Sequence, residues 1–311
     1  MIEVANLTKY YDNVCALNNI SFNINENEIT GLLGPNGAGK TTAMRIITGF
    51  LKKTNGKVLV NNLDVENDPV IVKRLIGYLP ESAPLYSDMM VYDYLKYTAA
   101  LYNIKKKSRI NDTAGLCGLT DVMHKNIGEL SKGYKRRVGL AHAMINDPRI
   151  LILDEPTDGL DPNQIIGIRN LIKEIGKTKT VILSTHILSE VEASCERVII
   201  INKGNIAADN KTVELQRSYN SKANITVCLT GCVFDELKEA SSGIRGVTNV
   251  ENVRLEPDAT CAVISTNEEI DIRGEIFKMV RDKGWILLEM RKEHNTLEKI
   301  FRDLTIGGKN E

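Results

Sequence analysis

Short apolar runs separated by polar turns recur along the first two thirds of the chain. They include Glu28–Leu33, Ile76–Leu79, Ile150–Leu153 and Thr180–Ser184. A run of about four to eight apolar residues is shorter than a typical helix and is characteristic of a strand buried on both faces of a parallel sheet. The pattern therefore predicts an α/β fold built on such a sheet.

Other segments predict the elements around that sheet. Ile2–Leu7 and Ile20–Asn25 precede most of the buried runs and are expected to form antiparallel strands. Apolar residues at helical spacing in Val91–Tyr102 and Ser131–Met144 predict helices. Residues 84–145 are therefore expected to be mostly helical.

Beyond residue 210 the composition changes, and a second domain is expected. Residues 212–219 predict a terminal helix, followed by a polar linker. The next elements are expected in the order β-α-β-β-α-β, at Ile225–Leu229, Phe234–Ala240, Val247–Leu255, Ala262–Ser265, Ile272–Lys283 and Trp285–Met290. This order predicts a small α+β domain of the ferredoxin-like kind.

The expected domain boundaries follow from these elements. The first domain takes residues 1–218, a linker takes 219–223, and the second domain takes 224–305. A short amphipathic segment, Leu297–Leu304, closes the second domain, and residues 306–311 form a tail. We interpret the second domain either as functional, in dimer contact or in regulation, or as a structural extension.

Composition and charge limit the kinds of partner. Lys+Arg and Asp+Glu both number 40, so the chain has no net charge that would attract nucleic acid. The start Met1-Ile2-Glu3-Val4 does not resemble a signal peptide, and no apolar run approaches the ~20 residues that cross a bilayer. The scattered cysteines are interpreted as reduced thiols of a cytosolic protein: Cys15, Cys117, Cys195, Cys228, Cys232 and Cys261.

A glycine-rich segment carries the most specific chemistry. Residues 34–41 read Gly-Pro-Asn-Gly-Ala-Gly-Lys-Thr, between a predicted strand and a predicted helix at Thr42–Thr48. Glycines let backbone N–H groups turn around phosphates, the lysine faces the outer phosphates, and the hydroxyl can ligate Mg²⁺. The helix start favours an anion as well. The segment predicts a nucleoside triphosphate site at Gly34, Pro35, Asn36, Gly37, Ala38, Gly39, Lys40, Thr41 and Thr42.

An acidic pair, Asp154 and Glu155, ends the apolar run Ile150–Leu153. Both carboxylates are then held at the edge of the sheet where α/β proteins bind ligands. Asp154 is placed to hold Mg²⁺, directly or through water, and Glu155 to polarise the attacking water. Alone, such a pair would be read as the solvated end of a strand. The phosphate loop makes the catalytic interpretation the better one.

The segment Leu130-Ser131-Lys132-Gly133-Tyr134 resembles the signature of ATP-binding-cassette (ABC) ATPases, usually Leu-Ser-Gly-Gly-Gln. The order of phosphate loop, signature, acidic strand, Asp158–Asp161 and His186 is similar to that family over roughly residues 1–210. The resemblance implies a P-loop NTPase core of the ABC type that hydrolyses ATP with Mg²⁺. It also implies antiparallel and helical subdomains, the helical one at about 84–145.

The resemblance implies roles for residues that bind or hydrolyse ATP. Tyr11 would stack on adenine, with Tyr10 as the neighbour that could substitute for it. His186 would contact the γ-phosphate and position the attacking water. Glu81 stands where the family usually has glutamine, and its carboxylate is expected near Mg²⁺ or a water bound to it.

The signature and the loop after Glu155 are implied to act between two copies of the chain. Ser131 and Gly133 would present a hydroxyl and a backbone N–H to the γ-phosphate of the second copy, although Ser131 is also suited to be an ordinary N-cap. Lys132 and Tyr134 depart from the family pattern. Asp161 would belong to the loop that links the two ATP sites.

We expect the ATP-hydrolysing subunit of an ABC transporter at the cytoplasmic face of the membrane. Its partners would be a separate transmembrane permease and a second copy of itself, with no nucleic acid. The tail Leu297–Thr305 resembles those of exporter-type bacterial ABC ATPases of the gliding-motility and multidrug subgroup, which implies export. The alternative is a soluble ABC ATPase acting on nucleic acid or ribosomes. Those usually carry two cassettes or a long coiled coil, and neither is visible here.

Overall fold

The computed structural model describes residues 1–215, 223–253, 259–266, 271–293 and 297–306. The chain separates into two compact units, Met1–Thr212 with Leu304–Glu311, and Val213–Asp303. Most of the predicted linker at 219–223 and of the predicted tail at 306–311 lies outside the described residues. The predicted domain boundaries therefore stay predictions, and each unit is described by itself.

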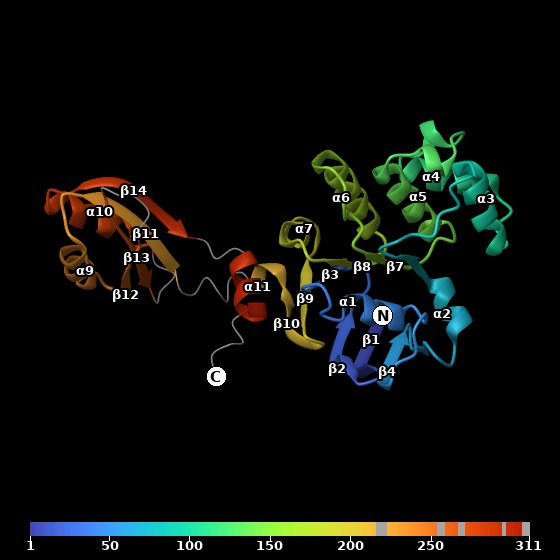
Figure 1. The fold of residues 1–311 in the computed structure, drawn as a ribbon, viewed down its shortest axis with the longest axis horizontal. Helices are drawn as coiled ribbons and strands as arrows, with labels where there is room; N and C mark the ends of the chain where they lie inside the picture. Colours follow the sequence, from blue (N-terminus) through green and yellow to red (C-terminus); the bar gives the residue numbers. More distant parts are fainter. Residues whose placement is uncertain (216–222, 254–258, 267–270, 294–296, 307–311) are drawn as a thin grey trace. The chain divides into compact units, whose positions relative to one another are not determined.

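A mostly parallel sheet forms the centre of the first unit (Figure 1). Within the described residues its strand order is β10-β9-β3-β8-β7-β6, with only β10 antiparallel to its neighbour. Every residue of β3, β7 and β8 is buried, which is why these strands read as continuous apolar runs. The strands are β3 Ile29–Leu33, β6 Ile76–Leu79, β7 Ile150–Asp154, β8 Thr180–Thr185, β9 Arg197–Asn202 and β10 Asn205–Lys211.

An antiparallel sheet shares its hydrophobic core with the parallel one. Its order is β2-β1-β4-β5, with β1 Ile2–Tyr11, β2 Val14–Ile24, β4 Asn55–Val60 and β5 Leu63–Asp64. The helix α1, Lys40–Ile47, buries Ala43, Met44 and Ile46 in the same core cluster. Both expected antiparallel strands exist and are longer than predicted, because hairpin pairing continues past their apolar stretches.

The first unit contains further helices. The bounds are α2 Pro69–Leu75, α3 Val91–Leu101, α4 Lys107–Leu116, α5 Lys132–Met144, α6 Pro162–Gly176 and α7 Leu188–Ser194, with 3₁₀ turns at Thr120–Val122 and Ile127–Glu129. Figure 1 shows α3, α4 and α5 gathered in one group, in green, where the sequence predicted a mostly helical region. Of these, α5 packs against β6. Residues 212–215 are helical.

The second unit is the predicted ferredoxin-like domain. Its elements are β11 Ala223–Thr230, α9 Phe234–Ser242, β12 Val247–Asn252, β13 Thr260–Thr266, α10 Arg273–Asp282 and β14 Ile286–Glu293. The antiparallel sheet order is β12-β13-β11-β14. Its core cluster joins residues of both helices to the sheet, including Leu237 and Ile276. The last helix, α11 Leu297–Ile306, occupies the predicted amphipathic segment. Its residues from Leu304 onward belong to the first unit, where the Leu304 carbonyl accepts a hydrogen bond from the Asn202 side chain.

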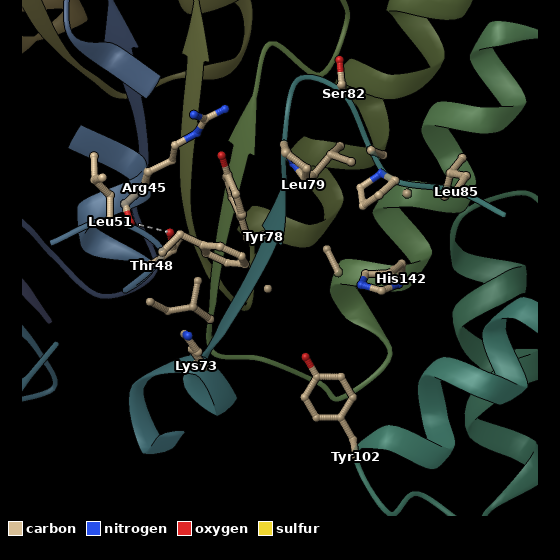
Figure 2. A pocket seen from close by; sticks show the side chains of 18 of the residues that line it. Arg45, Thr48, Leu51, Lys73, Tyr78, Leu79, Ser82, Leu85, Tyr102 and His142 are labelled. Atoms are coloured by element: carbon tan, nitrogen blue, oxygen red, sulfur yellow. Dashed lines mark hydrogen bonds between the residues drawn. The ribbon is translucent and has the colours of Figure 1, made fainter. Parts of the chain in front are cut away.

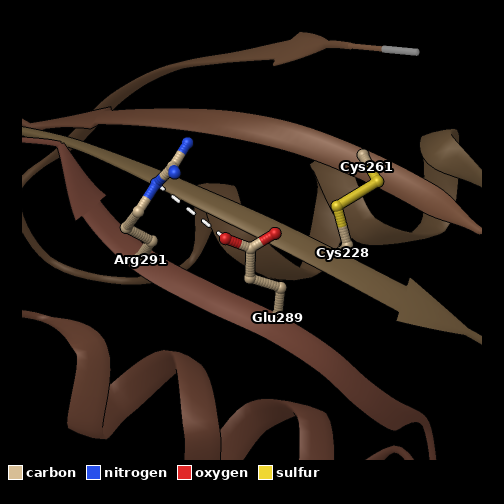
Figure 3. The surroundings of a disulfide bond; sticks show 4 residues. All are labelled: Cys228, Cys261, Glu289 and Arg291. Carbon is tan, nitrogen blue, oxygen red and sulfur yellow. Dashed lines mark ion pairs between the residues drawn. A yellow bond between two sulfur atoms is a disulfide. The ribbon is translucent and has the colours of Figure 1, made fainter. Parts of the chain in front are cut away.

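A disulfide joins two strands of the second unit and corrects one prediction. Cys228 of β11 and Cys261 of β13 are directly paired in the strand register, with their Cα atoms 4.1 Å apart and their sulfurs bonded (Figure 3). The prediction of reduced thiols is therefore wrong for these two residues. Their separation of 33 residues hid the pairing, because strand register is a tertiary property. Among the described residues Cys15, Cys117, Cys195 and Cys232 are free thiols.

Candidate active site

The phosphate loop, residues 34–41, connects β3 to α1 and needs glycine where strands crowd it. Gly39 has a φ of 112°, and a β-carbon there would lie 2.7 Å from the carbonyl oxygen of Ala16 in β2. A β-carbon on Gly34 would lie 2.3 Å from the carbonyl oxygen of Ile201 in β9. No other residue type fits this path unless a strand moves. The conformation of the loop is therefore set by the strands that approach it.

The loop opens onto a cavity of about 290 Å³ that collects residues from distant segments. Ten predicted site residues meet there because the carboxyl ends of β3, β6, β7 and β8 lie at one edge of the sheet. The lining residues are Ala16, Asn36, Gly37, Ala38, Gly39, Lys40, Thr41, Thr42, Glu81, Glu155, Asp158 and His186. The cavity thus places a cationic loop opposite carboxylates and an imidazole.

Lys40 lies folded against its own loop and is only 6% exposed. Its Nζ donates to the carbonyl oxygens of Gly34 at 2.7 Å and Pro35 at 3.3 Å, and lies 3.6 Å from Oε1 of Glu155. A buried ammonium group needs such partners, since its desolvation is costly. A phosphate entering the cavity would offer stronger, charge-assisted hydrogen bonds in their place.

Asp154 has one satisfied and one unsatisfied carboxylate oxygen. Its Oδ1 accepts hydrogen bonds from Ser184 Oγ at 2.6 Å and Thr41 Oγ1 at 3.3 Å. Its Oδ2 is buried and has no hydrogen-bond partner among the described residues. A buried carboxylate oxygen without a partner is costly, so this atom is suited to a cation or to a water bound to one. The Thr41 hydroxyl lies beside the same carboxylate and is the natural second ligand.

Glu155 faces His186 across the ends of two neighbouring strands. His186 Nδ1 lies 3.0 Å from Oε2 of Glu155, although the residues are 31 positions apart. The pairing of Asp154 with Ser184 in the β7–β8 register brings them together. Glu155 also has a φ of 47°, the left-handed region that side chains other than glycine rarely adopt. Its amide donates to Oγ of Ser184 at 3.1 Å.

Glu81 and Tyr11 are placed differently relative to the cavity. Glu81 follows β6 and lines the cavity, and its role near Mg²⁺ stays a prediction. Tyr11 ends β1 in the hairpin before β2, is 43% exposed, and lies under the Nζ of Lys9 at 5.1 Å from its ring centre. It is not among the residues that line the cavity. Its stacking role therefore stays a prediction.

The comparisons with known proteins agree with this geometry. The family model described as ABC transporter matches residues 17–158. The bacitracin transport ATP-binding protein BcrA of Bacillus licheniformis is 30% identical over 320 residues, which cover 99% of this chain and 98% of that protein. The chain belongs to the ATP-binding proteins of ABC transporters. The lantibiotic transport ATP-binding protein SrtF of Streptococcus pyogenes is 34% identical over 226 residues, which cover 72% of this chain and 94% of that protein.

Solved structures confirm the fold of this ABC ATPase. The dimeric post-hydrolysis structure of the ATP-binding cassette MJ0796 bound to ADP and Pi matches with a TM-score of 0.62 and 26% identity. The match covers 68% of this chain and 98% of that one. The predicted α/β P-loop core is confirmed, and so is the predicted activity, the binding and hydrolysis of ATP.

The signature residues of the ABC ATPase lie at a helix start outside the cavity. Ser131 is the N-cap of α5 and accepts from the Tyr134 amide at 3.3 Å. Gly133 packs tightly, because a β-carbon there would lie 2.6 Å from the Gln164 side chain of α6. Asp161 caps α6, accepting from the Gln164 amide at 2.9 Å. None of the three lines the ATP cavity of its own chain.

The structure adds two residues that the sequence reasoning missed. Ser184, the last predicted residue of an apolar run, holds Asp154 and the Glu155 amide. Its polar side chain in an otherwise apolar strand was the available signal. Arg136 of α5 is 8% exposed and bonds to backbone carbonyls beside the cavity. It was invisible because charged residues in helices are usually solvated.

Proposed function

We propose that the chain binds Mg·ATP in this cavity, hydrolyses it between two copies of itself, and thereby powers a separate export permease. The observation that carries the proposal is that the two carboxylates at the end of β7, Asp154 and Glu155, have different surroundings. Asp154 keeps a buried oxygen without a partner among the described residues, while Glu155 faces Lys40 and His186. A metal ligand and a water-polarising base are the parts that phosphoryl transfer to water requires.

The residues present fit magnesium held together with nucleotide. Asp154 Oδ2 and the Thr41 hydroxyl would hold it, and Glu81 lines the cavity together with Thr41. Among the described residues no cluster of three or more His, Cys, Asp or Glu side chains forms a metal cage. That fits Mg²⁺, which usually takes one or two carboxylates and completes its shell with phosphates and water. When bound, it would neutralise charge that develops on the phosphate oxygens.

Side chains of this protein would carry the remaining steps. Lys40 would exchange the Gly34 and Pro35 carbonyls for phosphate oxygens. Its departure from Glu155 would leave that carboxylate free to accept a hydrogen bond from the attacking water. An ionised carboxylate only accepts, so Nδ1–H of His186 would donate to Glu155 and hold it in place.

A second copy would complete the site. Ser131 is exposed at the start of α5, away from the ATP cavity of its own chain, as a contact made between copies requires, whereas Gly133 is buried against Gln164. The MJ0796 cassette, which shares this fold, forms a dimer with ADP and Pi bound. ATP would favour the closed dimer, and hydrolysis would release it.

A second, apolar cavity supports the proposal of a permease partner. It measures about 530 Å³ and is bounded by β6, α1 and the helical group (Figure 2). Its walls include the aromatic residues Phe50, Tyr78, Tyr94, Tyr102 and His142. No helix in the described part of the chain is long and apolar enough to cross a membrane. We propose that a helix of the permease, exposed at the cytoplasmic face, inserts here and tethers the subunit to that face.

The direction of transport rests on the relatives. The names of BcrA and SrtF assign them to bacitracin and lantibiotic transport. We propose that this protein likewise serves a system that removes a compound from the cell. These relatives favour transport over the alternative role on nucleic acid or ribosomes.

The test is affinity purification from detergent-solubilised membranes, with a matched pair of variants. Tyr102 lines the apolar cavity, whereas its neighbour Leu101 is 62% exposed and does not. We expect the wild type and Leu101→Glu to recover a polytopic membrane protein, and Tyr102→Glu to lose it. Recovery of ribosomes or DNA instead, or equal recovery by both variants, would argue against the proposal.

A further inference from the structure

Arg136 ties together the backbones of two loops that meet at the ATP cavity. Its Nη1 donates to the carbonyl oxygens of Pro80 at 3.1 Å and Glu81 at 2.5 Å. Its Nε donates to the Pro156 carbonyl at 3.1 Å, and its Nη2 to the carbonyl of Glu155. One guanidinium group thus holds the segment after β6 and the segment after β7.

These contacts need arginine rather than any cation. The donors of a guanidinium form a rigid planar fork, whereas a lysine ammonium is a compact point charge on a flexible stem. Burial lowers the pKa of Arg136, while the charges of Asp158, Asp154, Glu81 and Glu155 raise it. Arginine stays protonated in proteins, so Arg136 places a permanent positive charge near these four carboxylates.

The backbone of Glu155 needs such support. A non-glycine residue at positive φ costs of order 1–3 kcal/mol and persists only where its surroundings over-determine it. Ser184 holds the amide of Glu155 and Arg136 holds its carbonyl. The two bonds fix the peptide planes on either side of the Cα, and hence the direction in which the carboxylate leaves the backbone.

We propose that Arg136 is a positioning residue for hydrolysis. It orients the Glu155 carboxylate and fixes the position of the Glu155 loop relative to the Glu81 loop. The proposal rests on the catalytic role proposed for Glu155. Arg136 does not line the ATP cavity, and its hydrogen bonds among the described residues all go to backbone carbonyls. Its loss should therefore slow the chemical step and leave ATP binding nearly unchanged.

The test compares steady-state ATP hydrolysis and fluorescent-nucleotide binding in the full-length protein. Arg136→Lys and Arg136→Gln should lower kcat by ~10–100-fold, the usual cost of disturbing a supporting residue or of misplacing a catalytic group by about 1 Å. Nucleotide affinity and KM should change by less than about 3-fold. The matched control is Arg137→Gln, since Arg137 lies on the same helix and donates to the Cys117 carbonyl at 3.0 Å, away from the cavity.

A rescue experiment separates positioning from mere stabilisation. Arg136→Ala should regain kcat on addition of guanidinium ion, and methylammonium should not replace it, because only guanidinium presents the fork. An unchanged kcat in Arg136→Gln, or a loss of kcat and nucleotide binding together without guanidinium rescue, would overturn the proposal. Glu155→Gln distinguishes the two levels: if it hydrolyses ATP normally, the role of Glu155 fails, and if it is inactive while Arg136→Gln is normal, only this inference fails.

Discussion

At the scale of single residues, the site is a set of charges held ready for a ligand. Lys40 donates hydrogen bonds to two carbonyls of its own loop and forms an ion pair with Glu155. Asp154 has one buried oxygen without a partner among the described residues. Both arrangements are less favourable than what Mg·ATP would supply. Binding is thus expected to replace weak internal contacts with charge-assisted ones.

The first prediction concerns Lys40. Lys40→Ala removes the cation from the loop without touching its backbone, so the fold should persist. A hydrogen bond to a charged group is worth ~1.5–3 kcal/mol, so ATP affinity should fall by about 10–100-fold for each phosphate hydrogen bond that the lysine would make. Titration with a fluorescent ATP analogue measures this. Lys177→Ala, at the exposed C-cap just after α6, is the control, and wild-type affinity in Lys40→Ala would mean that the loop is not the site.

At the scale of elements, helix starts and strand pairs carry function and stability. The N-cap of α5 both closes a helix and presents Ser131 to the outside of the site. The β11–β13 pair carries a disulfide within its register. The start of α5 and the β11–β13 pair each lead to a prediction that depends on the whole element.

The second prediction concerns the dimer formed through α5. Glu155→Gln keeps the shape of the base but removes its negative charge, so hydrolysis should slow by roughly 10²–10⁴-fold while ATP still binds. Persisting ATP should then hold two copies together. Gel filtration should show an ATP-dependent dimer in Glu155→Gln. Adding Ser131→Arg should abolish it, because a long charged side chain would enter the interface.

That prediction would be contradicted by normal hydrolysis in Glu155→Gln. A variant that stays monomeric at saturating ATP would count against it equally. If Ser131→Arg left an observed dimer intact, the dimer would not involve the signature helix, and the two-copy site would have to be abandoned.

The third prediction concerns the disulfide. A cross-link that closes a loop of 33 residues restricts the unfolded chain by an amount worth about 3–4 kcal/mol. Cys228→Ala or reduction should lower the free energy of unfolding of the second unit by that much. Trp285 is the only tryptophan and packs on the core of this unit, so its fluorescence in urea reports the unit selectively. Cys232→Ser, which removes a free thiol, should not shift the transition.

At the scale of the whole molecule, buried ionisable groups determine how stability depends on pH. His142 lies in the apolar cavity, where its Nδ1 is 2.9 Å from the Tyr94 hydroxyl and 3.3 Å from Thr98 Oγ1. Burial lowers the pKa of His142 below its usual 6.5. The folded protein therefore takes up this proton less readily than the unfolded chain.

The fourth prediction follows from that difference. Stability from neutral His142 is fully present above the unfolded pKa of about 6.5 and is lost as the pH falls toward the depressed folded pKa, by at most ~1.4 kcal/mol per pH unit. In thermal melts between pH 7 and 5, His142→Gln should lose less stability than the wild type. Exposed His124→Gln is the control, and parallel pH curves for wild type and His142→Gln would refute the assignment.

Local patterns alone were enough for much of this protein. The strand at Ile76–Leu79 was predicted to the residue, because a short apolar run between polar turns has one favourable placement, inside a parallel sheet. The order β-α-β-β-α-β in the last third predicted the ferredoxin-like unit, because this order of elements is characteristic of that fold. The phosphate loop and the acidic pair were found because their chemistry needs fixed residue types at short spacing.

Only the tertiary structure decided how distant residues meet. The register of β7 against β8 brings Glu155 to His186, and the register of β11 against β13 brings Cys228 to Cys261. The packing of α5 on β6 brings Arg136 to the carbonyls of two loops. Spacing along the chain carries no record of such contacts. They depend on which strands become neighbours and how helices lie over them, and that outcome is set by burial of the whole core.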